Sequence, residues 1–177
     1  EDLPLPDQQQ FAEHIHQQSQ RLRHLIDRML LLTRLEKSTH DLELHQINVS
    51  KLLQQLIHQY HSQIQHKNLV CHFQIVAHCQ ITADSFWINQ AISNLFDNAI
   101  DFAQLNGIFA IHLQYINPEK VELLIFNEGT HIPDFAIHQL FDTYFSLPRP
   151  HNQQRSSGIG LSIVKQVIEQ HQANIQV

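Results

Sequence analysis

The longest regular pattern of apolar and polar residues lies near the start of the chain. Between Gln8 and about Lys37, apolar residues return at alternating steps of three and four, and no glycine or proline interrupts them. This spacing predicts one long helix with a heptad-like seam, which needs partner helices. Residues 1–7 contain two prolines and predict a loop, and the polar residues 37–46 predict a linker. The seam contains Ile15, Leu22, Leu25, Met29 and Leu32, and Ile26, Leu30 and Leu35 widen it.

Shorter patterns follow the linker. Helical spacing predicts helices over residues 50–67, 85–102, 134–140 and 159–171, with Ser50 and Asp84 as N-caps of the first two. Runs of strand-forming residues predict strands over 47–49, 69–76, 108–116 and 121–126, and the start of another at 174–177. The residues between the strands 108–116 and 121–126 predict a hairpin. The expected fold is α+β, a two-layer α/β sandwich with helices on one face of a sheet.

The helix predicted over 85–102 combines an apolar stripe with two asparagines on one edge. Asn94 and Asn98 are four residues apart, so they lie one turn above the other. Asparagine is a poor residue for a helix interior, and its carbonyl oxygen suits a hard cation such as Mg²⁺. Solvated or capping amides remain an alternative explanation. The stripe consists of Ile88, Ala91, Ile92, Leu95, Phe96, Ala99 and Ile100.

Composition excludes several classes of function. The 177 residues are 42% hydrophobic and 16% charged, which predicts a soluble globular chain. A net charge of -6 argues against a nucleic-acid partner. The sequence has no run of eighteen apolar residues, so we expect no contact with a membrane. The two cysteines, Cys71 and Cys79, have no metal-ligand spacing, which fits a reducing compartment. The 15 histidines are scattered over polar positions and indicate compositional bias rather than a metal site.

Two further segments contain residues suited to ligand binding. Asn127-Glu128-Gly129 follows a predicted strand, which places the Asn127 side chain at a strand end. Ser157-Gly158-Ile159-Gly160-Leu161 opens a predicted helix, where glycines and free backbone amides can approach an anion. The preceding loop carries Arg149 and Arg155 and is long enough to act as a lid.

Taken in this order, these motifs resemble the catalytic ATP-binding domain of sensor histidine kinases, in the superfamily shared with gyrase, Hsp90 and MutL. Residues 94–99 resemble the N box, 127–129 the G1 box, 141–145 the F box and 158–161 the G2 box. Residues 145–150 with 156–158 resemble the CreC-like subgroup. Residues 19–27 and 32–36 resemble the second helix of the dimerisation and phosphoacceptor hairpin. The resemblance implies a Bergerat ATP-binding fold over 41–177, lacking its last strands, and a partial helical region over 1–40 that forms a dimeric bundle.

The resemblance also implies roles for individual residues. Asn98 would coordinate Mg²⁺ on the phosphates of ATP, with Asn94 assisting. Asn127 replaces an aspartate and would accept a hydrogen bond from the adenine amino group. Asp101 stands where Lys or Arg is common, which leaves Arg149 or Arg155 for the phosphates. The implied ATP-binding residues also include Phe102, an aromatic position; Gly129, which would let the backbone approach the base; His131, in place of a second glycine; and Ile132, Phe145, Ser157, Gly158, Ile159, Gly160 and Leu161.

The implied activity is transfer of the γ-phosphoryl group of ATP to a histidine, for relay to the receiver domain of a response regulator. The phosphoacceptor motif is missing from the chain, since His14 and His16 lie on the wrong helix and lack its neighbouring residues. We therefore expect a fragment that cannot phosphorylate itself, from the cytoplasmic portion of a bacterial protein anchored in the inner membrane. A homodimer through the hairpin is also implied. Two alternatives stay open, a degenerate ATP-binding scaffold and an ATPase of the same superfamily.

Overall fold

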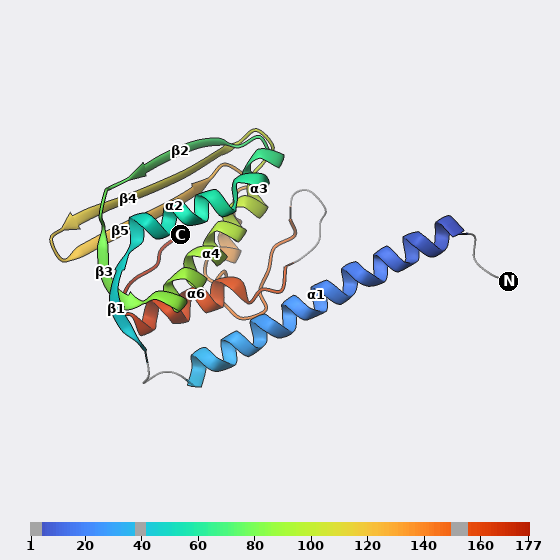
Figure 1. Ribbon diagram of the computed structural model, residues 1–177, viewed down its shortest axis with the longest axis horizontal. Helices are drawn as coiled ribbons and strands as arrows, with labels where there is room; N and C mark the ends of the chain where they lie inside the picture. The colour runs from blue at the N-terminus through green and yellow to red at the C-terminus, as the bar shows by residue number, and fades with distance from the viewer. Residues whose placement is uncertain (1–4, 38–41, 150–155) are drawn as a thin grey trace.

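The computed structural model describes residues 5–37, 42–149 and 156–177, which contain both helices and strands (Figure 1). The α+β class predicted from the sequence is confirmed. The elements are α1 (Leu5–Lys37), β1 (Leu44–Asn48), α2 (Val49–Gln59), α3 (His61–His66), β2 (Val70–Ile75), β3 (Gln80–Asp84), α4 (Ser85–Phe102), β4 (Ile108–Asn117), β5 (Lys120–Asn127), α5 (Asp134–Ile137) and α6 (Gly160–Gln170).

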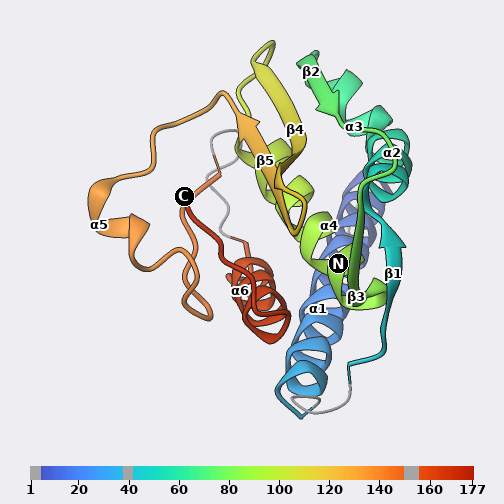
Figure 2. The ribbon, with the colours of Figure 1, turned by 90° about the vertical axis from the view of Figure 1, so that its left-hand side faces the viewer.

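The described strands form two sheets, where the sequence predicted one. β2, β4 and β5 form the larger sheet, with β2 parallel and β5 antiparallel to β4, and α2, α4 and α6 lie on one side of it (Figures 1 and 2). β1 and β3 form a separate antiparallel pair, from Leu44 opposite Asp84 to Asn48 opposite Gln80. The sequence prediction missed β3, and it assigned residues 44–46 to a linker. Residues 38–41 of that linker lie outside the described part of the chain.

The core forms between α4, α6 and the larger sheet. The predicted apolar stripe of α4 is confirmed, since all its residues are buried except Leu95, which is partly buried. The rings of Phe96 on α4 and Phe109 on β4 meet edge to face with centroids 5.6 Å apart, a favourable geometry for an aromatic pair. The predicted N-cap is also confirmed, because the Asp84 carboxylate accepts hydrogen bonds from the amides of Phe86 and Trp87.

α1 begins at Leu5, three residues earlier than predicted. Pro6 lies in the first turn, where a proline removes no intrahelical hydrogen bond. The N-terminal part of α1 projects away from the rest of the structure, whereas its C-terminal end packs against α6 (Figure 1). There Leu32 and Leu35 are buried, and the Gln170 side chain donates a hydrogen bond of 2.9 Å to the Leu35 carbonyl. None of the described helices has the length and apolar character needed to cross a membrane.

The helix predicted over 50–67 is divided at Tyr60 into α2 and α3. Tyr60 leaves the helical path, and its ring packs against Phe96 with centroids 5.4 Å apart. The predicted cap at Ser50 is also wrong. Asn48 is the N-cap and accepts from the Lys51 amide, while the Ser50 hydroxyl donates to the Val76 carbonyl at 2.6 Å. This second bond ties the start of α2 to the end of β2.

The later elements are shorter than predicted. α5 ends at Ile137 instead of residue 140, and α6 occupies residues 160–170 within the predicted 159–171. Residues 174–177 are not in a strand. Of the predicted loop that carries Arg149 and Arg155, residues 150–155 lie outside the described part of the chain. The hairpin between β4 and β5 is confirmed, and its turn is held by the Asn117 side chain, which accepts from the Glu119 amide.

Lys67 closes the C-terminal end of α4 from a distant part of the sequence. Its Nζ donates hydrogen bonds to the carbonyls of Ile100 (2.6 Å), Asp101 (2.9 Å) and Ala103 (2.9 Å). Carbonyls at a helix end have no intrahelical partner, and a positive charge there is favourable. Burial lowers the pKa of Lys67, an effect that the nearby Asp101 opposes.

We predict that Lys67→Met lowers the free energy of unfolding by about 2 kcal/mol, because it leaves three helix-end carbonyls without their donor. Urea denaturation would measure the change. Lys51→Met is the matched control, since the Lys51 side chain is exposed. Equal stability of the two variants would show that the Lys67 contacts do not hold the end of α4.

Candidate functional site

A cavity of about 920 Å³ lies along α4, between the segment after β5 and the loop before α6. Segments far apart in the sequence therefore meet around it. Thirteen of the residues predicted for a binding site line it: Asn94, Asn98, Asp101, Phe102, Asn127, His131, Ile132, Phe145, Arg149, Ser157, Gly158, Gly160 and Leu161.

The polar edge of α4 supplies one wall of the cavity. Asn94, Asp97, Asn98 and Asp101 follow one another at steps of three or one, so they lie along two turns of the helix. Asn94 is only 7% exposed, and within the described residues its Nδ2 has no hydrogen-bond partner. A buried donor without a partner is costly. Because Asn94 lines the cavity, its side chain brings an amide group with an unsatisfied donor to the cavity wall.

The start of α6 supplies a second wall. The Tyr144 amide donates to the Gly158 carbonyl at 2.9 Å, and the Ser146 hydroxyl donates to the Ser156 carbonyl at 3.1 Å. These bonds join the two ends of the loop. Gly158 has φ of +67°, and a Cβ there would collide with the backbone of Tyr144, so only glycine fits. No side chain among the described residues caps α6, which leaves its first amides for an anion.

Two of the described predicted site residues do not line the cavity, and a third cannot be placed. Ile159 is fully buried in the core. Gly129 forms a backbone bridge with Ala103, and a Cβ at Gly129 would collide with the Phe102 carbonyl. Because Gly129 has no side chain, the end of α4 can lie close to the residues after β5. Arg155 lies outside the described residues.

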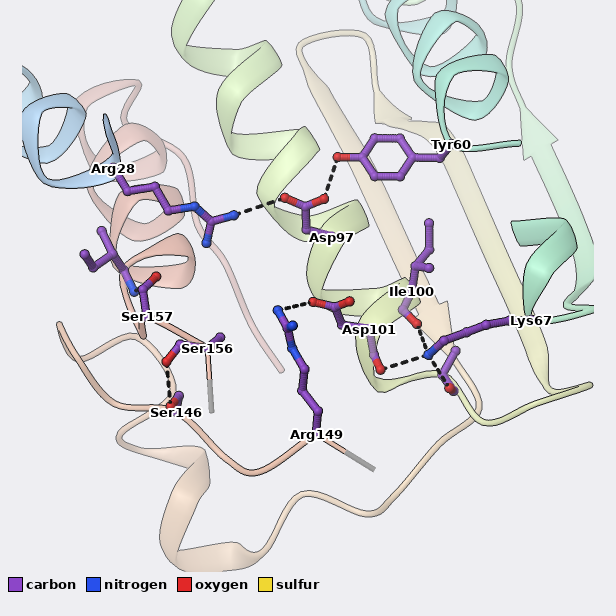
Figure 3. A network of polar contacts seen from close by, with 12 residues as sticks. Arg28, Tyr60, Lys67, Asp97, Ile100, Asp101, Ser146, Arg149, Ser156 and Ser157 are labelled. Carbon is purple, nitrogen blue, oxygen red and sulfur yellow. Dashed lines mark hydrogen bonds and ion pairs between the residues drawn. The ribbon is translucent and has the colours of Figure 1, made fainter. Parts of the chain in front are cut away.

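Asp101 and Arg149 form an ion pair across the cavity (Figure 3). Burial raises the pKa of the Asp101 carboxyl above its ordinary value, and the Arg149 guanidinium opposes that rise. Arg149 therefore places a positive charge beside Asp101, the acid that stands where Lys or Arg is common in the family. This pair joins the loop before α6 to the last turn of α4.

Sequence reasoning missed a second ion pair in the same cavity. Arg28 of α1 lines the cavity, and its Nη2 lies 3.2 Å from Oδ2 of Asp97 (Figure 3). The Tyr60 hydroxyl donates to Oδ1 of Asp97 at 2.8 Å, and burial together with this bond raises the pKa of Tyr60. The sequence did contain a signal for this ion pair, because Arg28 lies within the apolar seam of α1, three residues after Leu25 and four before Leu32. A charge within an apolar stripe indicates a polar partner.

Comparisons with known proteins agree with this geometry. The family model for histidine kinase-, DNA gyrase B-, and HSP90-like ATPases matches residues 83–177. The sensor protein CreC of Escherichia coli (strain K12) is 31% identical over 157 residues, which are 89% of this chain and 32% of CreC. The catalytic domain of histidine kinase ThkA is 25% identical, with a TM-score of 0.65 over 73% of this chain and 84% of that one.

A structure of full-length ShkA in complex with AMPPNP shares the fold over 96% of this chain and 35% of that one, with a TM-score of 0.75 and 19% identity. The chain spans about a third of the length of the first curated relatives, 32% and 36%. The family model covers more than half of the chain, including α4, the segment after β5 and α6. The chain therefore belongs to the family of histidine kinase-, DNA gyrase B- and HSP90-like ATPases and contains the ATPase domain found in sensor histidine kinases.

Proposed function

We propose that the chain binds ATP with Mg²⁺ in this cavity and presents the γ-phosphate to a histidine on a helical hairpin of the whole protein. One observation carries the proposal. The amides of Asn94 and Asn98 and the uncapped start of α6 line the same cavity. Amide oxygens suit a hard cation, and free helix amides suit phosphates.

The adenine end of the nucleotide lies against the residues after β5. The Asn127 side chain, at the end of that strand, accepts a hydrogen bond from the adenine amino group, and Ile132 and Phe102 provide apolar contact with the ring. These three residues line the cavity. An amide oxygen lacks the charge of the aspartate common at this position in the family, so the hydrogen bond is weaker.

The phosphate end lies between α4 and α6. Asn98, assisted by Asn94, holds Mg²⁺, which neutralises phosphate charge when it is bound. The residues present fit this ion, because both side chains line the cavity and each offers an amide oxygen, the kind of ligand that Mg²⁺ takes. Arg149, now paired with Asp101, supplies a positive charge that can contact the phosphates.

The reaction is a displacement at phosphorus. A ring nitrogen of the acceptor histidine attacks the γ-phosphorus, the bond to the oxygen that bridges the β- and γ-phosphorus breaks, and ADP leaves with the electron pair. Such a transfer depends on positioning and charge neutralisation. Hydrolysis is not favoured, because ATPases of this superfamily place a glutamate where this chain has Asn94, and an amide does not accept a proton at neutral pH.

The whole protein acts as a homodimer and passes its phosphoryl group to the receiver domain of a response regulator. Exposed apolar residues on α1 support the dimer: Ile15 is 50% exposed, Leu22 59% and Met29 47%. The structure of ThkA in complex with the response regulator protein TrrA supports the second partner. On this proposal the chain lies on the cytoplasmic side of a protein anchored in the inner membrane.

We predict that Asn98→Ala abolishes binding of ATP that depends on Mg²⁺, because it removes the proposed metal ligand. Isothermal titration of the chain with ATP, with and without Mg²⁺, would measure this. The melting temperature of the free protein should stay nearly unchanged. Asn89→Ala is the matched control, since Asn89 is exposed on the same helix. Equal affinity of wild type and Asn98→Ala would remove Asn98 from this role.

We predict that the chain alone neither labels itself with radioactive ATP nor releases phosphate rapidly. When the chain is joined to an upstream helix with the missing histidine motif, the protein should acquire a label that is acid-labile and alkali-stable, as expected of a phosphohistidine. Rapid phosphate release by the chain alone would favour an ATPase. The absence of label on the extended protein would contradict the kinase proposal.

We also predict that the same extended protein is a dimer, because the apolar seam of α1 needs partner helices. Analytical ultracentrifugation would measure its mass. Leu22→Glu should weaken the dimer by placing a charge in the seam, whereas Glu13→Gln should not. A strictly monomeric extended protein would overturn this part of the proposal.

A further inference from the structure

Arg28 places a positive charge from α1 at the phosphate end of the cavity. Its Nη2 contacts Asp97 at 3.2 Å, and a methyl group added to Gly160 would lie 3.6 Å from its Nη1. The same methyl group would lie 3.4 Å from Oδ1 of Asn94. The guanidinium therefore lies beside both the polar edge of α4 and the first residue of α6.

Three kinds of hydrogen-bond donor belong to residues around this part of the cavity. Arg28 supplies its guanidinium, and α6 supplies the amides of its uncapped first turn. The third donor is Nδ2 of Asn94, which is buried and has no partner among the described residues. Grouped donors with a helix N-terminus favour an anion with several oxygen atoms.

We propose that Arg28 is a phosphate-binding residue, which exchanges its contact with Asp97 for the terminal phosphate when a nucleoside triphosphate enters the cavity. This inference rests on the proposed binding of ATP. The exchange costs little, because the side chains of Arg28 and Asp97 are 32% and 40% exposed and such ion pairs stabilise weakly. An arginine can contact two phosphate oxygens at once, which is a stronger interaction.

Asp97 keeps a partner after the exchange. The Tyr60 hydroxyl donates to its other oxygen at 2.8 Å, so the carboxylate is not left without a hydrogen bond (Figure 3). The position of Arg28 is also well fixed. It lies one turn before Leu32, which is buried, and Leu35 follows within the same packed end of α1. Nucleotide binding and the position of α1 are therefore coupled, and the coupling acts in both directions.

Titration calorimetry of the whole chain with ATP, ADP and adenosine, the nucleotides with Mg²⁺, would test the inference. We use Arg28→Met, which keeps the apolar stem and removes the charge, and Arg28→Lys, which restores a charge. Arg28→Met should weaken ATP binding about tenfold or more, weaken ADP binding less and leave adenosine binding unchanged. Arg28→Lys should recover part of the loss. Arg23→Met is the control, since Arg23 is exposed on α1 and outside the cavity lining.

Asp97→Asn separates phosphate binding from a purely structural ion pair. If Arg28 binds phosphate, Asp97→Asn should bind ATP as tightly as wild type or more tightly, because it releases the arginine. If the pair only holds α1 in place, Asp97→Asn should weaken ATP binding as much as Arg28→Met does. That result, or unchanged ATP affinity in Arg28→Met, would overturn the inference while leaving ATP binding intact. A folded wild-type chain that binds no ATP would instead overturn the proposed function and this inference with it.

Discussion

Burial of the apolar face of α4 fixes the direction of its polar edge, and the cavity depends on that direction. Phe96 is fully buried against Phe109, and Ala99 and Ile100 continue the same stripe. Asn98, which precedes Ala99, and Asp101, which follows Ile100, must then face away from the core. Asp84 at the start of α4 and Lys67 at its end hold the helix against sliding or fraying. Rigid placement of this kind is what a binding site on a helix requires.

Charge is balanced in the cavity before any nucleotide arrives. Asp97 and Asp101, one turn apart on α4, each pair with an arginine from a different segment. The two arginines offset the negative charge of these two carboxylates within the cavity. The sequence alone suggested that Asp101 could mark a degenerate site, because it stands where Lys or Arg is common in the family. In the structure, Arg149 brings a cation to Asp101 from the opposite wall of the cavity.

The sequence predicted the elements whose patterns are long and local. The eighteen residues of α4 repeat their apolar spacing over several turns, and the β4–β5 hairpin carries its own turn residues. β3 could not be predicted in this way, because its five residues become a strand only by pairing with β1, far away in the sequence. The division of the predicted helix 50–67 has a similar origin. The Tyr60 ring packs on Phe96 and its hydroxyl binds Asp97, and both contacts belong to the tertiary structure.

Prediction of the candidate site from the sequence meets the same limit. Its residues on α4, after β5 and at the start of α6 could be predicted because short motifs carry them, whereas Arg28 belongs to no motif. Yet α1 is the element that joins the exposed seam at Ile15 and Leu22 to the cavity at Arg28. On the proposed function and the inference about Arg28, α1 packs on partner helices at one end and contacts the nucleotide at the other. A rearrangement of the proposed bundle that turns α1 would then also move a positive charge relative to the phosphates, and this would give the helical region a physical means of changing the affinity of the cavity for ATP.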